Sequence, residues 1–163
     1  MISDGTAPGT MLLKNIYPGV FSSYPSGLVK SSDLNEVFFQ ATNGTNGYEL
    51  WKTDGTEQGT VLVHDINPGS GNSNPGNIVP FVFQQQTVTP GVFFTADAPT
   101  VGNEIFFTDG VQENPTLAVD MNIGLTSSDV QNLIVVGTSL VCRADGPSGI
   151  ELAVLNELSI EAT

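Results

Sequence analysis

Three aspartates begin short glycine-containing segments that could form either tight turns or a metal site. Asp4 and Asp54 each begin an Asp-Gly-Thr triplet, and Asp109 begins a related segment without the Thr residues. An aspartate side chain accepts hydrogen bonds from backbone amides one or two residues on, and the following glycine adopts positive φ without steric cost. We therefore expect all three aspartates to form turns, with metal ligation as the alternative.

Three glutamates follow loops that are rich in Asn, Asp and Gly. They are Glu49, Glu104 and Glu151, and Asp97 and Asp145 begin two of the loops. We expect the glutamates to cap loop amides. The alternative is a weak Ca²⁺ or glycan site, because Ca²⁺ prefers oxygen ligands. No loop has the twelve-residue EF-hand spacing, so Ca²⁺ stays an option without an assigned metal ligand.

The single tryptophan and the single cysteine could also take part in binding or catalysis. Trp51 corresponds to Phe106 and Ala153 in later copies of its segment. We expect packing between neighbouring units, and a sugar-stacking platform is the alternative. Cys142 lies in the apolar run LIVVGTSLVCRA. We expect it to be a buried packing residue, because the only histidine, His64, lies in a different strand-like run and cannot be paired with the thiol from sequence.

Catalytic signatures are missing from the sequence. There is no GxSxG, no HExxH, no phosphate-binding Gly-rich loop with Lys, and no Cys/His metal quartet. Two carboxylates could perform glycoside hydrolysis, but nothing marks a particular pair. Asn43-Gly44-Thr45 fits an N-glycosylation pattern, to which we assign no function. We assign no catalytic, cofactor-binding or metal-binding residues.

Composition indicates an all-β chain. Of its 163 residues 39% are apolar, and 18 glycines and 10 prolines divide it into short segments without helical periodicity. No apolar run is long enough to span a membrane. The 17 acidic and 4 basic residues give a net charge of −13, and the cations are scattered. This charge excludes nucleic acid and anionic membrane surfaces as partners. The N-terminal MISDGTAPGT has no signal-peptide pattern.

Self-similarity organises the chain into units. Asp54-Gly55-Thr56 repeats Asp4-Gly5-Thr6 at an offset of 50 (54 minus 4), and Glu104 follows Glu49 by 55. Glu151 follows Glu104 by 47 in a weaker copy. We divide the chain into 1–19, the last strand or hairpin of a unit, two full units at 20–69 and 70–124, and an incomplete unit at 125–163.

Each full unit has the size of a four-stranded antiparallel β-propeller blade. In the second full unit we expect strands at Ile78–Phe83, Gly91–Ala96, Glu104–Thr108 and Thr116–Met121. In the last unit we expect them at Gln131–Val136, Leu140–Ala144 and Glu151–Leu155, with Leu158–Glu161 as a candidate fourth strand.

The two ends leave the number of blades open. Thr10–Ile16 resembles a fourth strand, so residues 1–19 either complete the last unit or are the remnant of a preceding blade. About three blades are fewer than the 4 to 8 of typical propellers. We therefore expect a homo-oligomer if the fold is a propeller.

The best-preserved copy, YELWKTDGTEQGTVLVHDINPG, resembles the bacterial ELWxxDGT repeat. The residues that fit are Glu49, Leu50, Trp51, Asp54, Gly55, Thr56, Gly59, Thr60, Asp65, Ile66, Pro68 and Gly69. The preceding Phe-Phe-x-Ala strand of the family is matched at 38–41 and 93–96. The resemblance implies propeller-like blades in a secreted or surface-attached bacterial protein, with no well-defined activity.

These observations favour a non-catalytic extracellular scaffold or adhesion module. The second hypothesis is a lectin-like propeller that binds carbohydrate or Ca²⁺, and the third is a propeller-type hydrolase. A glycan or protein ligand would bind on the face that carries the glutamate loops and the connections between units, because loops on a rigid scaffold usually carry function.

Overall fold

The structure is a computed structural model that describes residues 3–84, 88–111, 114–122, 127–146 and 148–156. The described residues contain strands and no helix, in antiparallel sheets of four, four and three strands. The all-β prediction is confirmed. The sheets lie at residues 26–64, 76–119 and 131–155, so each falls within one of the predicted units.

Within each sheet the strands are neighbours in chain order. The first sheet contains β1 (Ser26–Lys30), β2 (Val37–Thr42), β3 (Tyr48–Thr53) and β4 (Val61–His64). The second contains β5 (Gly76–Gln84), β6 (Val88–Ala98), β7 (Gly102–Thr108) and β8 (Thr116–Val119). The third contains β9 (Gln131–Val136), β10 (Ser139–Gly146) and β11 (Gly149–Leu155).

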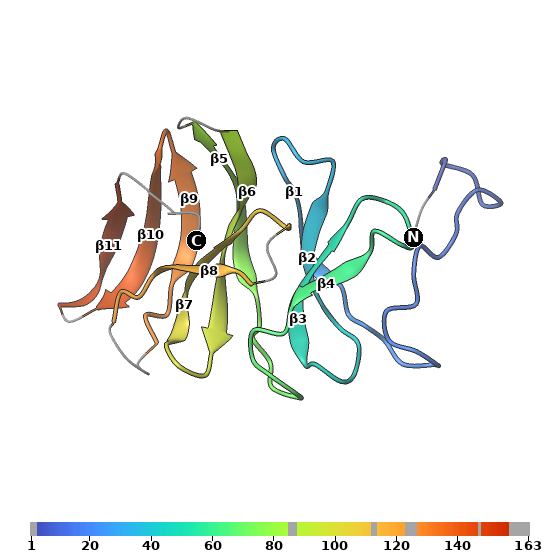
Figure 1. The fold of residues 1–163 in the computed structure, drawn as a ribbon, viewed down its shortest axis with the longest axis horizontal. Helices are drawn as coiled ribbons and strands as arrows, with labels where there is room; N and C mark the ends of the chain where they lie inside the picture. The colour runs from blue at the N-terminus through green and yellow to red at the C-terminus, as the bar shows by residue number, and fades with distance from the viewer. Residues whose placement is uncertain (1–2, 85–87, 112–113, 123–126, 147, 157–163) are drawn as a thin grey trace.

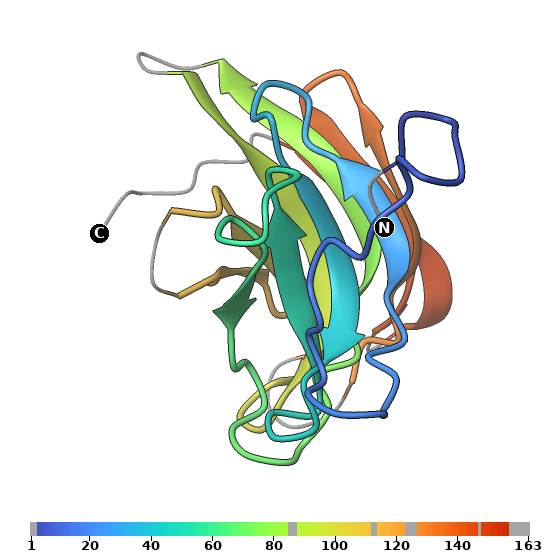
Figure 2. The same cartoon turned by 90° about the vertical axis from the view of Figure 1, so that its right-hand side faces the viewer.

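The three sheets lie side by side in a row (Figure 1). Strand contacts between sheets involve β1 with β5, β2 with β5, and β5 with β9. Figure 2 looks along the row from its right-hand end, so the sheets overlap in that view. The N-terminal segment lies beyond the first sheet, and β11 lies at the opposite end.

Apolar residues on both faces of the strands form the cores between the sheets. Successive side chains of a strand point to opposite faces, so Phe38 packs toward the second sheet and Phe39 packs away from it. The core between the first two sheets contains Phe38, Leu50, Ile78, Val92, Phe94, Ala96 and Phe106. The core between the second and third contains Phe81, Phe93, Ile105, Phe107, Val130, Leu133, Leu140, Cys142 and Ala144.

Most strand predictions are correct in position but too short. We expected a strand at Gly91–Ala96, but β6 runs from Val88 to Ala98 and continues through Pro90. Pro90 pairs with Val82 of β5, but β7 pairs with β6 only from Val92 onward. Proline is tolerated where a strand has a neighbour on one side only, because its missing N–H breaks no ladder bond there.

The expected strand at Thr10–Ile16 is wrong. Only Met11 in this segment makes an isolated bridge. The segment lies against the first sheet, where Ile16 packs on Phe39 and Trp51. None of the strand pairings among the described residues includes this segment, so it packs against the first sheet without joining a ladder. The candidate strand Leu158–Glu161 lies outside the described residues.

The backbone adopts the same unusual conformation at matching positions before each sheet. Tyr24, Asn74 and Asp129 have φ of 47°, 45° and 47°. Gly27, Asn77 and Asn132 have φ of 64°, 46° and 55°. Both series have spacings of 50 and 55 residues, the same offsets that relate the sequence segments. Positive φ is uncommon for residues other than glycine, so this agreement places residues with the same offsets at comparable points of the three sheets.

Candidate functional site

The Asp-Gly-Thr segments are hydrogen-bonded turns. Asp54 Oδ1 accepts bonds from the Thr56 amide at 2.9 Å and the Thr56 hydroxyl at 2.7 Å. Asp4 Oδ1 accepts the same pair from Thr6 at the same distances. These bonds lower the pKa of both carboxyl groups, with the hydroxyl bond as the larger cause. The turn role predicted for Asp4 and Asp54 is confirmed.

Asp109 forms a reduced version of this turn. Its Oδ1 accepts a 2.8 Å bond from the Val111 amide, and the Gly110 amide donates to Thr108 Oγ1 at 3.0 Å. The turn prediction is therefore correct for Asp109 too. The turn also contacts the first sheet, because Lys52 Nζ donates to the Gly110 carbonyl at 2.7 Å while it pairs with Glu36 at 2.8 Å.

Glu49 is buried under the connection between the first and second sheets. Its side chain is 0% exposed. Its carboxylate accepts bonds from the Ile66 amide at 3.0 Å, the Ser73 amide at 3.0 Å and the Ser73 hydroxyl at 2.5 Å. The Ser73 amide also donates to the Tyr48 carbonyl at 3.0 Å. Glu49 therefore holds two points of the connection, as the capping prediction expects.

Glu104 holds the next connection in the same way. It is 0% exposed and accepts bonds from the Met121 amide at 3.1 Å, the Ser128 amide at 3.1 Å and the Ser128 hydroxyl. The register is also the same: Glu49 is opposite Ala41, and Glu104 is opposite Ala96. In both cases the bonded amides lie 17 and 24 residues after the glutamate.

Burial shifts the titration of both glutamates. Loss of solvent raises the pKa of Glu49 to about 7, and the bonds from Ser73 and Ile66 oppose that rise. Burial also raises the pKa of Glu104, with the bonds from Ser128 and Met121 acting against it. A raised pKa is common in catalytic acids, but here three short-range donors already occupy each carboxylate.

Glu151 differs from the other two glutamates. It is opposite Ala144, in the same register as Glu49 and Glu104, but it is exposed. The structure thus brings each of Glu49 and Glu104 together with a connection, but not Glu151.

Sequence reasoning missed the serines that bind these glutamates. Ser73 and Ser128 are both 0% exposed. Their carbonyls accept bonds from the Asp97 and Asp145 amides at 2.7 and 2.6 Å. Each serine therefore joins the end of one sheet to the loop of the next. The signal was available, because Ser73 and Ser128 have the same 55-residue spacing as Glu49 and Glu104.

The loop before β7 and the connection between sheets share one face, as predicted. The Asp97 carboxylate accepts bonds from Asn74 Nδ2 at 3.0 Å and Asn103 Nδ2 at 2.8 Å. In the preceding loop, Asn43 Oδ1 accepts bonds from the Thr45 and Asn46 amides. Much of the polar capacity of this face is used within the chain.

Trp51, Phe106 and Ala153 are packing residues, as expected. Trp51 is 6% exposed and lies with Phe39 and Ala41 on the outer face of the first sheet. Phe106 is buried in the core between the first two sheets, and Ala153 packs against the core between the second and third. The geometry therefore supplies no open aromatic platform at these three positions.

Cys142 is buried in the core between the second and third sheets. Burial raises the pKa of its thiol, so the thiolate is disfavoured. His64 is in β4 of the first sheet, whereas Cys142 is in β10 of the third. The two side chains are therefore on opposite sides of the second sheet, and the packing role of Cys142 is confirmed.

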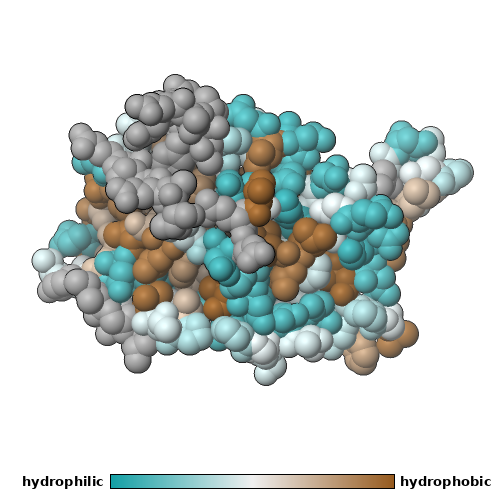
Figure 3. All heavy atoms as spheres, in the orientation of Figure 1, coloured by the Kyte–Doolittle hydropathy of each residue, from teal (hydrophilic) through white to brown (hydrophobic). Residues whose placement is uncertain are grey.

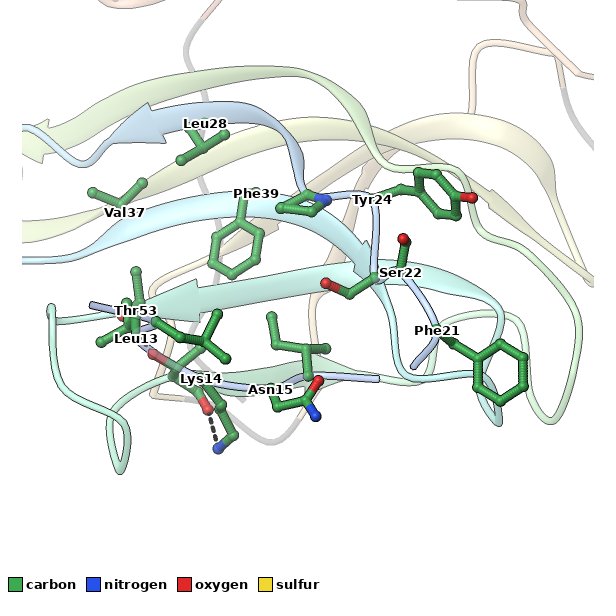
Figure 4. Close-up of a pocket in the computed structure, with 15 residues that line it drawn as sticks. Leu13, Lys14, Asn15, Phe21, Ser22, Tyr24, Leu28, Val37, Phe39 and Thr53 are labelled. Atoms are coloured by element: carbon green, nitrogen blue, oxygen red, sulfur yellow. Dashed lines mark hydrogen bonds between the residues drawn. The ribbon is translucent and has the colours of Figure 1, made fainter. Parts of the chain in front are cut away.

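A pocket of about 700 Å³ lies on the outer face of the first sheet. Leu28, Val37 and Phe39 project from β1 and β2 toward the N-terminal segment that carries Leu13 (Figure 4). Phe21 and Tyr24 lie at one end of the same hollow. Lys14 turns away to donate hydrogen bonds to the Glu57 and Thr60 carbonyls at 3.1 and 2.6 Å. The lining is largely apolar and contains no acid.

Among the residues that the structure describes, no three His, Cys, Asp or Glu side chains are grouped closely enough to hold a metal ion. Within the same residues there is also no helix of the length and apolarity needed to cross a membrane.

Comparison with known proteins found no matching family model, no similar curated protein and no similar solved structure. The resemblance to the ELWxxDGT repeat therefore stays a prediction that depends on the motif residues alone.

Proposed function

We propose that this chain is a non-catalytic repeat module, a scaffold or adhesion unit of a bacterial surface or secreted protein. The observation that carries the proposal is the internal use of the repeated acids. Glu49 and Glu104 bind the connections between sheets, and Asp54 binds its own turn. Glu49 and Glu104, whose repeated spacing could have indicated a binding site, thus hold one sheet to the next, and Asp54 closes its own turn.

The stacking of the sheets supports a propeller-type fold, which is part of this proposal. Neighbouring sheets contact each other through β1, β2, β5 and β9, and side chains of β3, β7 and β10 also take part in the cores between them. Four-stranded antiparallel sheets packed in succession are the building units of propellers. The matching positive-φ residues add the regular spacing that a repeat requires.

The extracellular setting follows from the ELWxxDGT resemblance. The net charge of −13 fits a protein exposed to salt, where high charge maintains solubility. The polar loop face, which includes Asn43, Asn74 and Asp97, is the surface on which a glycan or protein ligand would bind. Hydrogen bonds within the chain already fix the side chains of this face, so a ligand would bind to a surface that is ordered before binding.

Thermal unfolding with and without millimolar Ca²⁺, combined with a glycan array and fluorogenic glycoside substrates, tests the proposal. A scaffold is expected to show no shift in Tm, no glycan binding and no turnover. A ligand that binds the folded state raises Tm by mass action. A Ca²⁺-dependent shift or glycan binding that Asp97→Asn abolishes would favour the lectin-like alternative. Turnover that the same variant abolishes would favour the hydrolase.

A further inference from the structure

One end of the row exposes a leucine whose counterparts are buried between the sheets. Leu50 and Ile105 are 0% exposed, whereas Leu152 is 73% exposed. The three residues have the same place in their sheets, each one position after the repeated glutamate. Leu152 belongs to the outer face of the third sheet, here called the downstream face, whose exposed apolar residues are Ile134, Val136, Ile150, Leu152 and Val154. The strand register also places Arg143 opposite Leu152 and Asp145 opposite Ile150 on this face. Apolar surface is visible at this end of the molecule in Figure 3.

The opposite end shows the complementary exposure. Ile78 and Leu133 are 8% and 5% exposed and pack toward the preceding sheet. Leu28, which precedes them by 50 and 105 residues, is 65% exposed. Leu28 lines the pocket with Val37 and Phe39, and these three residues define the upstream face. Phe39 is 4% exposed, because Ile16 of the N-terminal segment packs on it, so Leu28 is the exposed part of this face. A contiguous exposed apolar patch such as the downstream face marks an interaction site.

The chain already contains two contacts between a downstream and an upstream face. Phe38 and Leu50 of the first sheet pack against Val92, Phe94 and Phe106 of the second. Phe93, Ile105 and Phe107 of the second pack against Leu133, Leu140 and Cys142 of the third. The downstream face of the third sheet and the upstream face of the first sheet, where Leu28 is exposed, therefore have the positions of the two halves of this contact.

The glutamate and the serine that bond to each other inside the row are also found separately at its two ends. Glu49 binds Ser73, and Glu104 binds Ser128, 24 residues later in each case. Glu151 is exposed, and Ser23 precedes Ser73 by 50 residues. Ser23 already accepts the Thr42 amide at 3.0 Å through its carbonyl, as Ser73 accepts the Asp97 amide at 2.7 Å. Ser23 thus has the bond to its own sheet, and the described residues show no bond from it to a glutamate.

We propose that a second copy of this chain stacks head to tail on the first, with its upstream face on the downstream face of the first copy. Leu152 of the first copy then packs near Leu28 of the second, and Ser23 of the second copy donates to Glu151 of the first. The strand series β1, β5, β9 continues into β1 of the second copy. Because the two faces differ, the contact is heterologous and produces a closed ring or an open row. This association is independent of the proposed scaffold or adhesion role.

The charge of the chain predicts how salt affects the association. Two copies with a net charge of −13 each repel at low ionic strength. The screening length is about 10 Å at 0.1 M salt and shortens as salt is added. Added salt should therefore strengthen the stacking, because the contact is largely apolar.

Light scattering coupled to size exclusion, at several protein concentrations, tests the proposal with two blocked variants. Leu152→Glu blocks the downstream face, and Leu28→Glu blocks the upstream face. Wild type is expected to show masses of two or more chains of 17.1 kDa. Each variant alone is expected to be a monomer, and an equimolar mixture is expected to form a dimer through the two unblocked faces.

The mixture separates this head-to-tail contact from other modes of association. A wild type that stays monomeric at all concentrations and salt levels would overturn the proposal, as would a mixture that does not associate. Association of Leu152→Glu alone would also contradict it. Circular dichroism and Tm confirm folding, which is expected to be kept because both leucines are exposed.

As a second variant, Ser23→Ala is expected to weaken association by roughly tenfold, since a hydrogen bond to a charged group contributes about 1.5 kcal/mol or more. An unchanged affinity would remove Ser23 from the contact.

Discussion

At the residue scale, we expect the bond between Ser73 and Glu49 to stabilise the connection between the first two sheets. The Ser73 hydroxyl donates to Glu49 at 2.5 Å, and both residues are 0% exposed. Ser73→Ala leaves a buried carboxylate with one donor fewer, so we expect the free energy of unfolding to fall by about 1–3 kcal/mol. Urea unfolding at a concentration where the chain is monomeric measures this loss.

Ser23→Ala is the matched control for that variant. Ser23 has the corresponding position before the first sheet, but no glutamate in the described residues accepts its hydroxyl. Its free energy of unfolding as a monomer should stay close to that of wild type. Equal losses for the two variants would contradict a specific role for the bond between Ser73 and Glu49.

Glu49 makes stability depend on pH. Burial raises its pKa from 4.5 to about 7, so the folded state binds this proton more tightly than the unfolded state. The stabilisation is fully present below pH 4.5 and is lost as the pH rises to about 7. Across that window we expect Glu49 to lower the free energy of unfolding by on the order of 3 kcal/mol. Urea unfolding at a series of pH values measures the slope.

Glu49→Gln should flatten this pH dependence, because the side chain no longer titrates. Part of the slope will remain, since burial also raises the pKa of Glu104. The same slope in wild type and in Glu49→Gln would show that Glu49 does not titrate in this window.

At the element scale, the turn before β3 needs a glycine because the next connection lies directly over it. Gly47 has φ of 71°, and a Cβ there would be 1.8 Å from the Gly71 carbonyl oxygen. Gly149 has the same position in the third sheet, with φ of 91°, but a Cβ there would meet nothing within 4 Å. Both glycines have positive φ, but only Gly47 has another backbone segment directly over it.

Gly47→Ala should therefore destabilise the chain more than Gly149→Ala. Both variants incur the strain of alanine at positive φ, and only the first displaces a connection. We expect the difference to be about 1–3 kcal/mol, the usual range for overpacking. Thermal or urea unfolding of the two variants gives this difference directly. An equal loss would mean that the overlap between Gly47 and the connection relaxes without cost.

The strands could be predicted from the sequence more reliably than their ends. Alternating apolar residues and Gly or Pro boundaries located the strand at Gly91–Ala96, but its extension through Pro90 depended on which neighbours β6 has. The segment Thr10–Ile16 has the pattern of a strand and does not form one, because a strand needs a partner that a local pattern does not specify. Tertiary context decided both cases.

The candidate site was predictable only in part. The turns at Asp4 and Asp54 follow from local chemistry, since each bond spans two residues. The role of Glu49 depends on Ser73, which is 24 residues away, so the sequence suggested a cap without showing what it caps. The raised pKa of Glu49 was not predictable at all, because it depends on burial under the connection.

At the scale of the whole molecule, the chain is a row of three sheets. The repeated glutamate binds the following connection in the first two sheets and is exposed in the third. Glu49 and Glu104 bind the serines of the following connection, and Glu151 is exposed. Ser73 and Ser128 are buried, and Ser23 is not. The repeated acids Glu49 and Glu104 hold consecutive sheets together, and the described residues show no such bond for Glu151 or Ser23.

Amide hydrogen exchange at a concentration where the chain is monomeric tests this account most directly. The amides of Ser73 and Ser128 each donate to a glutamate and to a backbone carbonyl, so their exchange should need an opening of the connection. We expect strong protection at Ser73 and Ser128 and fast exchange at Ser23, with Glu49→Gln reducing protection at Ser73 but not at Ser128. Exchange at Ser73 and Ser128 as fast as at Ser23 would contradict the account.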